Sequence, residues 1–277
     1  MLDAAACVGT HDLVLLTLDT LRFDVAERAL LEGRTPWLSA LLDRTPARAW
    51  ERRHTPGSFT WAAHQAFFAG FLPTPIEPGP HPRLFAMAFA GSETTTEQTA
   101  VFDAPDLVSG LRGRGYHTIC AGGVGFFNEQ TPLGRVLPEL FDEHRWCPEF
   151  GVTARDSTRS QVAWACERIA AQPDDRRVFC FVNVSALHQP NCHYLPGRER
   201  DDPETQAAAL AYVDGELGPL FEALRRRAPV LAIVCSDHGT AYGEQGHVGH
   251  RLAHPVVWEV PYAEVLLPQI LHVEAEQ

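Results

Sequence analysis

The chain has 277 residues, 45% of them hydrophobic and 21% charged, which is typical of a soluble globular protein. Its net charge of −12 argues against nucleic acid or an anionic membrane surface as the main partner. All 23 basic residues are arginine, which excludes catalysis by lysine. No stretch approaches the roughly 20 apolar residues that span a bilayer.

The seven cysteines are an odd number and form no C-x-x-C pair. Cys120, Cys180 and Cys235 lie inside apolar runs, where free thiols usually pack as small hydrophobic groups. The N-terminus has no basic segment of the kind that begins a signal peptide. These features together predict a reducing, cytoplasmic setting.

The first third of the chain predicts a buried strand and three helices. An apolar run from Asp12 ends in the carboxylate of Asp19, and continuous apolarity indicates a strand covered on both faces. Helical patterns follow at 25–31 and at 36–44, the second with Thr35 as its expected cap and Pro36 as its first residue. A third helix is expected at 61–69, closed by Gly70.

The remaining elements alternate between helices and strands. Residues 73–82 and 94–99 predict irregular surface segments, and 126–151 shows no clear pattern. Such alternation is typical of an α/β fold with a mostly parallel sheet flanked by helices, here as a single domain over 1–277. Helices are expected at 106–114, 156–171 and 203–227, and strands at 115–123, 178–184, 230–235 and 262–267.

Three of the predicted apolar strands lead into side chains that bind metals. Asp19 ends the first, His188 and His193 follow the strand at 178–184, and Asp237-His238 follows the strand at 230–235. In open α/β sheets, ligands bind outside the carboxyl ends of the strands. A metal site assembled from these three strand ends is therefore predicted.

Each of these residues also has an ordinary interpretation when it is taken alone. An Asp at a strand end is more often a turn or cap residue, and a loop histidine usually makes ordinary hydrogen bonds. His64 is interpreted as a residue that supports the metal ligands without binding the metal, or as one that packs in the core. Cys192 is interpreted as a packed thiol. The joint pattern, rather than any one residue, favours the metal site.

Taken in chain order, these segments resemble the alkaline phosphatase superfamily, and within it the sulfatase-like branch. Residues 16–24 resemble that branch's first metal-binding strand, and Ser236-Asp237-His238-Gly239 resembles its final one. The spacing Thr60-x3-His64-x5-Gly70-x2-Pro73 is similar to the family's nucleophile helix, with Thr60 in the nucleophile position. Residues 110–118 and 212–218 resemble two further family elements. The resemblance implies the alkaline-phosphatase-like α/β fold.

Two departures from the family pattern bear on the chemistry. Arylsulfatases carry a Cys or Ser in C/S-x-P-x-R, whereas this chain has Thr60-Trp-Ala-Ala-His64. They also carry two active-site lysines; this chain has none, and His250 stands where the second would fall. Sulfate-ester hydrolysis by the usual route is therefore not expected.

The segment His188-Gln-Pro-Asn-Cys-His193 resembles the H-Q-x-x-x-H element of phosphoethanolamine transferases. In those enzymes a further histidine lies twelve residues beyond the S-D-H histidine, and His238 and His250 have that spacing. This favours His250 over His247 as the distal partner, although both lie in the same Gly-rich loop. The pattern shifts the expectation from sulfate to phosphoryl chemistry.

We therefore expect a metal-dependent hydrolase of phosphate esters or phosphonates that acts on a small anionic ester through a covalent phospho-Thr60. Asp19, Asp237 and His238 are expected to hold one divalent metal, with Thr60 as a further ligand or close neighbour. His188, His193 and His250 hold a second metal, or bind the phosphoryl oxygens if there is only one. Imidazole-rich ligands favour Zn or Mn. The alternatives are a sulfatase, a phosphoryl transferase or mutase on the same site, and a non-catalytic metal-binding protein.

Overall fold

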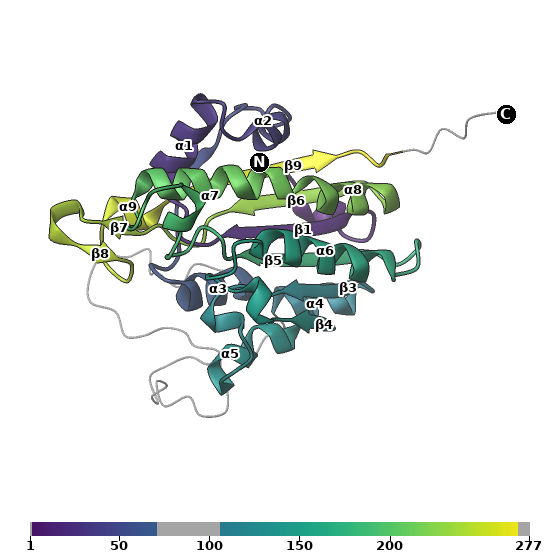
Figure 1. The fold of residues 1–277 in the computed structure, drawn as a ribbon. Helices are drawn as coiled ribbons and strands as arrows, with labels where there is room; N and C mark the ends of the chain where they lie inside the picture. The colour runs from purple at the N-terminus through teal and green to yellow at the C-terminus, as the bar shows by residue number, and fades with distance from the viewer. Residues whose placement is uncertain (1, 71–105, 271–277) are drawn as a thin grey trace, which may run out of the picture.

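A mostly parallel sheet forms the centre of the fold (Figure 1). The computed structural model describes residues 2–70 and 106–270. Within them the sheet has seven strands in the order β2-β9-β6-β1-β5-β3-β4. The five strands from β6 to β4 run parallel, whereas β9 is antiparallel to both β6 and β2. The predicted α/β class with a mostly parallel sheet is confirmed.

The strands and helices have the following bounds. The strands of the sheet are β1 (Asp12–Leu18), β2 (Glu51–His54), β3 (His117–Ala121), β4 (Glu143–Arg145), β5 (Val178–Val184), β6 (Val230–Cys235) and β9 (Glu259–Leu267). A separate pair consists of β7 (Ala241–Tyr242) and β8 (Val248–Gly249). The helices are α1 (Phe23–Leu31), α2 (Pro36–Leu42), α3 (Thr60–Ala69), α4 (Leu107–Gly113), α5 (Pro132–Val136), α6 (Ser157–Ala170), α7 (Pro203–Glu216), α8 (Gly218–Arg227) and α9 (Pro255–Trp258).

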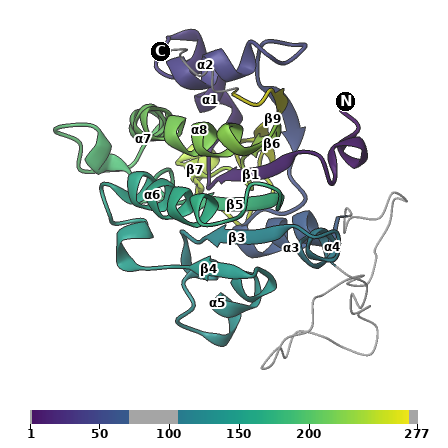
Figure 2. The same ribbon diagram turned by 90° about the vertical axis from the view of Figure 1, so that its right-hand side faces the viewer.

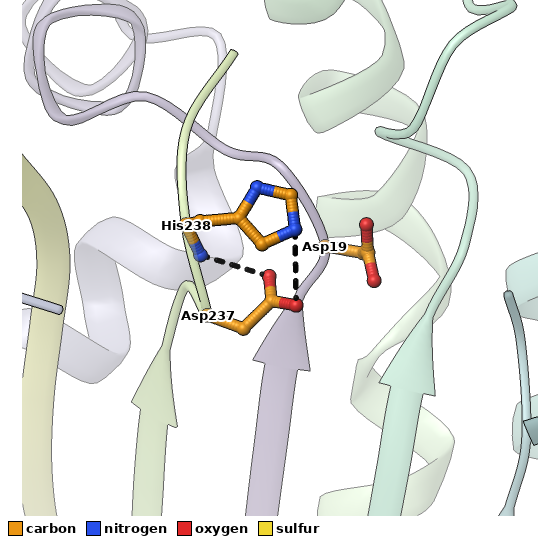
Figure 3. Close-up of side chains that lie close together, drawn as sticks. All are labelled: Asp19, Asp237 and His238. Carbon is orange, nitrogen blue, oxygen red and sulfur yellow. Dashed lines mark hydrogen bonds and ion pairs between the residues drawn. The ribbon is translucent and has the colours of Figure 1, made fainter. Parts of the chain in front are cut away.

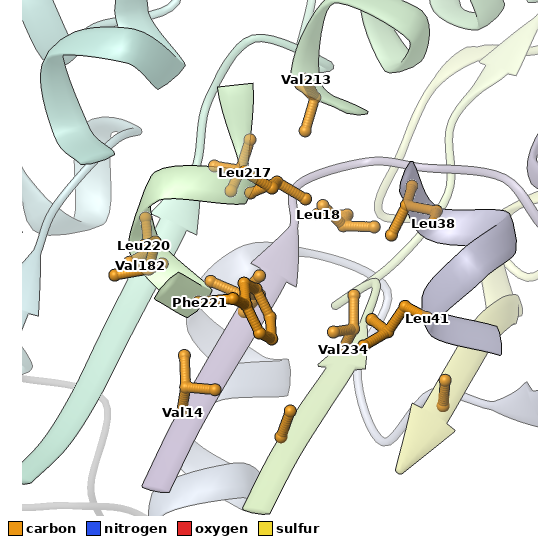
Figure 4. Close-up of a cluster of buried hydrophobic side chains, with 14 of the residues drawn as sticks. Val14, Leu18, Leu38, Leu41, Val182, Val213, Leu217, Leu220, Phe221 and Val234 are labelled. Carbon is orange, nitrogen blue, oxygen red and sulfur yellow. The ribbon is translucent and has the colours of Figure 1, made fainter. Parts of the chain in front are cut away.

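Helices cover both faces of the sheet, which explains why the central strands are apolar throughout (Figure 2). All seven residues of β1 and of β5 are buried. Side chains on one face of β1, such as Val14 and Leu18, pack with α1, α2, α6, α7 and α8 (Figure 4). Leu13 and Leu15 point to the opposite face, which α3 and α4 cover. Strands buried on two faces need no alternation of polar and apolar residues.

The prediction of a single long helix at 203–227 is wrong. The structure has two helices, α7 and α8, that meet at Leu217. Pro219 explains the break. A proline has no backbone N–H, and its ring clashes with the carbonyl four residues earlier. Proline is tolerated in the first turn of a helix, which is where Pro219 lies in α8.

The start of α2 also differs from the expectation. Thr35 precedes the helix, but its side chain makes no capping hydrogen bond. The carboxylate of Asp214 on α7 accepts the N–H groups of Trp37 at 3.0 Å and Leu38 at 2.7 Å instead. A distant residue thus supplies the cap that the local pattern assigned to Thr35.

Two strands of the seven-stranded sheet were not predicted, nor was the separate pair β7 and β8. β2 has the sequence Glu-Arg-Arg-His, without an apolar run, and β4 lies inside 126–151, where no pattern was found. Both are short edge strands, which need few apolar residues because only one of their sides is paired. Residues 73–82 and 94–99 lie outside the described residues.

We predict that Leu16→Ala lowers the free energy of unfolding by about 3 kcal/mol, because Leu16 in β1 is 0% exposed and its removal leaves a cavity. Leu31→Ala is the matched control, since Leu31 is 81% exposed, and it should change stability by less than about 0.5 kcal/mol. Urea denaturation of both variants measures the difference. Equal effects would contradict the placement of β1 at the centre of the core.

Candidate metal centre

The carboxyl ends of three adjacent strands carry the candidate site. β1 lies between β5 and β6, and Thr17 is level with Asn183 on one side and with Cys235 on the other. Asp19 follows β1 by one residue, and Asp237 follows β6 by two. The two carboxylates therefore reach the same edge of the sheet, as the sequence predicts.

Asp19, Asp237 and His238 form a compact cluster (Figure 3). One ligand atom from each lies within 4.8 Å of the others, and all three side chains are 0% exposed. Nε2 of His238 is 3.5 Å from Oδ2 of Asp237. Oδ1 of Asp19 and Oδ2 of Asp237 are buried without a hydrogen-bond partner among the described residues. Unpartnered buried carboxylate oxygens beside an imidazole are a donor set that suits a divalent cation.

Hydrogen bonds from neighbouring groups orient the cluster. The N–H groups of Thr20 and His238 donate to Oδ1 of Asp237 at 3.2 and 3.0 Å. Nδ2 of Asn183, on β5, donates to Oδ2 of Asp19 at 3.1 Å. Nδ1 of His238 donates to the carbonyl of Gly239 at 2.9 Å. That bond leaves the Nε2 lone pair of the neutral ring directed at the cluster, as a metal ligand requires.

The electrostatics of the cluster favour a bound cation. Burial raises the pKa of Asp237, and burial together with the nearby Asp237 carboxylate raises the pKa of Asp19. Burial lowers the pKa of His238, which keeps its ring neutral. A divalent cation would offset the cost of two adjacent buried negative charges, and the residues present therefore fit a metal.

Thr60 is the first residue of α3 and lies beside the cluster. Its Oγ1 is 3.3 Å from Nε2 of His238 and 3.5 Å from Oδ2 of Asp19, and its side chain is buried. The preceding residue, Phe59, is extended and provides no side-chain cap for the helix. An uncapped helix start next to a hydroxyl group is a suitable place for an anion.

His64 supports Thr60 from one turn further along α3. Its Nδ1 donates to the carbonyl of Thr60 at 2.8 Å, and its Nε2 accepts from Oγ1 of Thr17 at 3.0 Å. The ring contacts four phenylalanines, and burial lowers its pKa to about 3, so it stays neutral. These phenylalanines are Phe67, Phe68, Phe127 and Phe181. The structure therefore places His64 behind the site.

Two of the other predicted histidines lie next to the cluster. The ring centroid of His250 is 4.6 Å from that of His238 and 5.8 Å from that of His188. Nδ1 of His188 donates to the carbonyl of Gln189 at 2.6 Å, which leaves its Nε2 lone pair available. His247 is exposed in the loop between β7 and β8. Of the two histidines in the Gly-rich loop, the structure thus brings His250, not His247, to the site.

His193 lies in a different environment. Its ring packs on Tyr194, with centroids 4.2 Å apart. Burial lowers its pKa, and the charges that act on it are Arg155 and Asp201 rather than the cluster. His193 is not part of the compact group of Asp19, Asp237 and His238, although its Nε2 is also buried without a hydrogen-bond partner among the described residues. Its ligand role stays a prediction. Spacing from His188 cannot determine which way a side chain points after a tight turn.

Sequence reasoning missed Asn183 and Thr17, which connect the cluster to α3. Asn183 donates to Asp19 and, at 3.3 Å, to Oγ1 of Thr17, which in turn donates to His64. A signal was present in the sequence, because Asn183 and Thr17 are the only polar side chains inside the apolar strands β5 and β1 after the initial Asp12.

The mostly parallel sheet and the strand-end cluster agree with the fold and the metal site that the resemblance to the alkaline phosphatase superfamily implies. Residues 14–267 match the family model described as Sulfatase, and the chain belongs to that family. A comparison with curated proteins found no match.

Solved structures show the same fold at low sequence identity. The soluble domain of lipooligosaccharide phosphoethanolamine transferase A from Neisseria meningitidis has a TM-score of 0.61 and 15% identity, over 92% of this chain and 76% of that one. The zinc complex of the C-terminal periplasmic domain of EcEptC from Escherichia coli has a TM-score of 0.61 and 13% identity, and the match covers 94% of this chain and 73% of that one. An alkaline phosphatase superfamily protein from Vibrio parahaemolyticus has a TM-score of 0.57 and 17% identity, and the match covers 94% of this chain and 61% of that one.

The prediction of a cytoplasmic location is contradicted by these comparisons, because the similar domain from Escherichia coli is periplasmic. The buried cysteines do not indicate the compartment, and the reason is physical. Cys120, Cys180 and Cys235 are buried, and burial raises the pKa of each thiol, so they are unreactive in any compartment. In the described part of the chain, no helix is long and apolar enough to cross a membrane.

We predict that the buried carboxylates destabilise the metal-free protein as pH rises. The unfolded chain releases the Asp237 proton at about pH 4, whereas the folded state releases it at about 7. Between these values the folded state binds more protons than the unfolded state. Stability therefore falls as pH rises through this window and falls no further above it.

Asp237→Asn removes this ionisation while its amide oxygen can still accept from Thr20 and His238. Its free energy of unfolding, measured in chelator at about pH 8, should exceed that of the unsubstituted protein by on the order of 2 kcal/mol. Asp43→Asn, at an exposed position, is the control. A variant that is no more stable than the unsubstituted protein at this pH would show that burial does not disfavour the Asp237 charge.

Proposed function

We propose that the protein cleaves phosphate esters or phosphonates in a metal-dependent reaction with Thr60 as the nucleophile. The observation that carries the proposal is the position of Oγ1 of Thr60, 3.3 Å from Nε2 of His238 and 3.5 Å from Oδ2 of Asp19. A hydroxyl group that touches two candidate ligands, at the start of a helix, is placed for activation and attack.

Asp19, Asp237 and His238 would hold one divalent metal, with Thr60 as a further ligand or close neighbour. When bound, such a metal lowers the pKa of a hydroxyl and stabilises negative charge on phosphoryl oxygens. The mixed oxygen and nitrogen donors favour Zn or Mn. The similar domain from Escherichia coli was solved as a zinc complex, which supports zinc as the first metal to test.

The covalent step forms a bond from Oγ1 of Thr60 to phosphorus and breaks the bond from phosphorus to the ester oxygen, which leaves with a proton as the alcohol. Water then attacks the phosphothreonine and releases phosphate and the free Thr60 hydroxyl. His188 and His250 lie beside His238 and would bind the phosphoryl oxygens or a second metal. An imidazole nitrogen that carries a proton can donate to a phosphoryl oxygen, and one that carries a lone pair can bind a metal.

Transfer of the phosphoryl group to an alcohol is the second candidate. The similarity to phosphoethanolamine transferases favours it, because an acceptor alcohol replaces water in the second step without any change in the first. Sulfate-ester cleavage is disfavoured by Thr60 at the nucleophile position and by the absence of lysine from the chain.

Thr60→Ala should lower turnover of phosphate esters at least about a thousandfold, because it removes the nucleophile. Thr60→Ser keeps a hydroxyl and should retain measurable turnover. Metal content, measured on the same preparations, should stay close to that of the unsubstituted protein in both variants. Unchanged turnover in Thr60→Ala would rule out the covalent mechanism.

We expect the metal-loaded protein to release inorganic phosphate from a phosphate monoester in water. With an added alcohol such as ethanolamine, hydrolysis predicts the same product, whereas transfer predicts a new phosphate ester, which ³¹P NMR distinguishes. Chelator-treated protein provides the blank. If no turnover occurs with phosphate mono- or diesters, phosphonates or sulfate esters, the protein is a non-catalytic binder.

A further inference from the structure

Arg251 directly follows His250, and its backbone is tied to the loop that precedes Thr60. Its N–H donates to the carbonyl of Ser58 at 2.9 Å. Its φ of 68° lies in the left-handed region, which a residue with a side chain adopts only where its surroundings hold it there. The loop that leads into Thr60 and the segment that carries His250 are therefore joined by the hydrogen bond of Arg251.

The guanidinium group of Arg251 lies over the aromatic ring of Phe59, with Cζ 4.9 Å from the ring centroid. Phe59 immediately precedes Thr60, so this cation–π contact holds the positive charge at the start of α3. Burial is the main cause of the lowered pKa of His238 and of His250, and the Arg251 charge adds to it, as expected for a cation close to these rings.

This guanidinium has no carboxylate partner within ion-pair distance among residues 2–70 and 106–270. Arg22, which lies near the same loops, differs because Asp24 and Glu244 neutralise it. One face of the Arg251 guanidinium rests on Phe59. Within the described part of the chain its N–H groups make no hydrogen bond, which leaves them for a ligand. An arginine fork matches the geometry of two oxygens of a phosphate or carboxylate.

A pocket of about 260 Å³ opens beside Arg251. It is bounded by the loop at 54–58, which leads to Thr60, by residues 251–253, and by Trp258 of α9. Such a volume can hold a small acidic group. The protein carries a net charge of −12, so an unpaired cation at this position is the local exception to the overall charge.

We propose that Arg251 and this pocket form an oxyanion-binding subsite for the substrate. The inference rests on the proposed function and adds the chemical class of the group that is recognised. The oxyanion is either a non-bridging oxygen pair of the reacting phosphoryl group or a second acidic group on the alcohol portion of the ester. Arg251 is thereby a residue that determines specificity, separate from the metal ligands.

The test compares Arg251→Gln, Arg251→Lys and the control Arg48→Gln in metal-loaded protein. Arg48 matches Arg251 in being exposed with a left-handed φ, here 50°, but it lies on the loop between α2 and β2. Inorganic phosphate binding, measured by calorimetry, should weaken about tenfold in Arg251→Gln and remain unchanged in Arg48→Gln. Arg251→Lys should fall between them, because lysine keeps the charge without the fork.

Two esters separate the two sources of the oxyanion. Ethyl phosphate carries only the phosphoryl group, whereas phosphoglycolate adds a carboxylate to a similar frame. An equal rise in KM for both in Arg251→Gln assigns Arg251 to the phosphoryl oxygens, and a rise for phosphoglycolate alone assigns it to the second acidic group. In both cases kcat changes less than KM.

The proposal is overturned if Arg251→Gln binds phosphate and both esters as the unsubstituted protein does. If no ester is turned over, the proposed function fails, yet the affinities of the three variants for inorganic phosphate and for phosphoglycolate, measured by calorimetry, still decide the role of Arg251. Thermal unfolding of each variant verifies that it is folded.

Discussion

Two carboxylates buried side by side at the edge of the sheet impose the main physical constraint on this protein. Asp19 and Asp237 are both 0% exposed, and burial of a charge without compensation is costly. The surrounding backbone supplies part of the compensation. Thr20 adopts a left-handed φ of 63° and directs its N–H at Asp237, although such a conformation is unfavourable for a residue other than glycine. The carboxylate oxygens that remain unpartnered are the reason to expect a cation.

The same constraint explains how α3, which begins at Thr60, is held. A chain of buried hydrogen bonds runs from Asp19 through Asn183, Thr17 and His64 to the carbonyl of Thr60. Each side chain in it is buried. Asn183 donates to both Asp19 and Thr17, Thr17 donates to His64, and His64 donates to the Thr60 carbonyl, so a shift of any member leaves a polar atom unsatisfied. The position of Thr60 is thereby coupled to the position of Asp19 through packed groups rather than through the loop itself.

The features that could be predicted from the sequence are those fixed by strand ends. Apolar runs that stop at Asp19 and before Asp237 place both side chains at one edge of a parallel sheet, whatever the loops do. His193 shows the limit, because its direction depends on a short turn anchored by Asp201, which accepts the N–H groups of Asn191 and Cys192. The cap of α2 shows another limit, since Asp214 reaches it from a helix far along the chain.

The central position of β1 has a consequence for how the chain assembles. The hydrogen bond from Val178 to Asp12 joins residues 166 positions apart, and that from Thr20 to Asp237 joins residues 217 apart. During synthesis the first strand is made long before either neighbour, so its apolar side chains have no sheet to enter. Contacts between residues so far apart in the chain make folding slow, because the entropy cost of closing the long loops comes before strand pairing stabilises the sheet. The two carboxylates of the candidate metal centre meet only after β6 has been made, so a cation bound there would stabilise the finished sheet but could not guide its early steps.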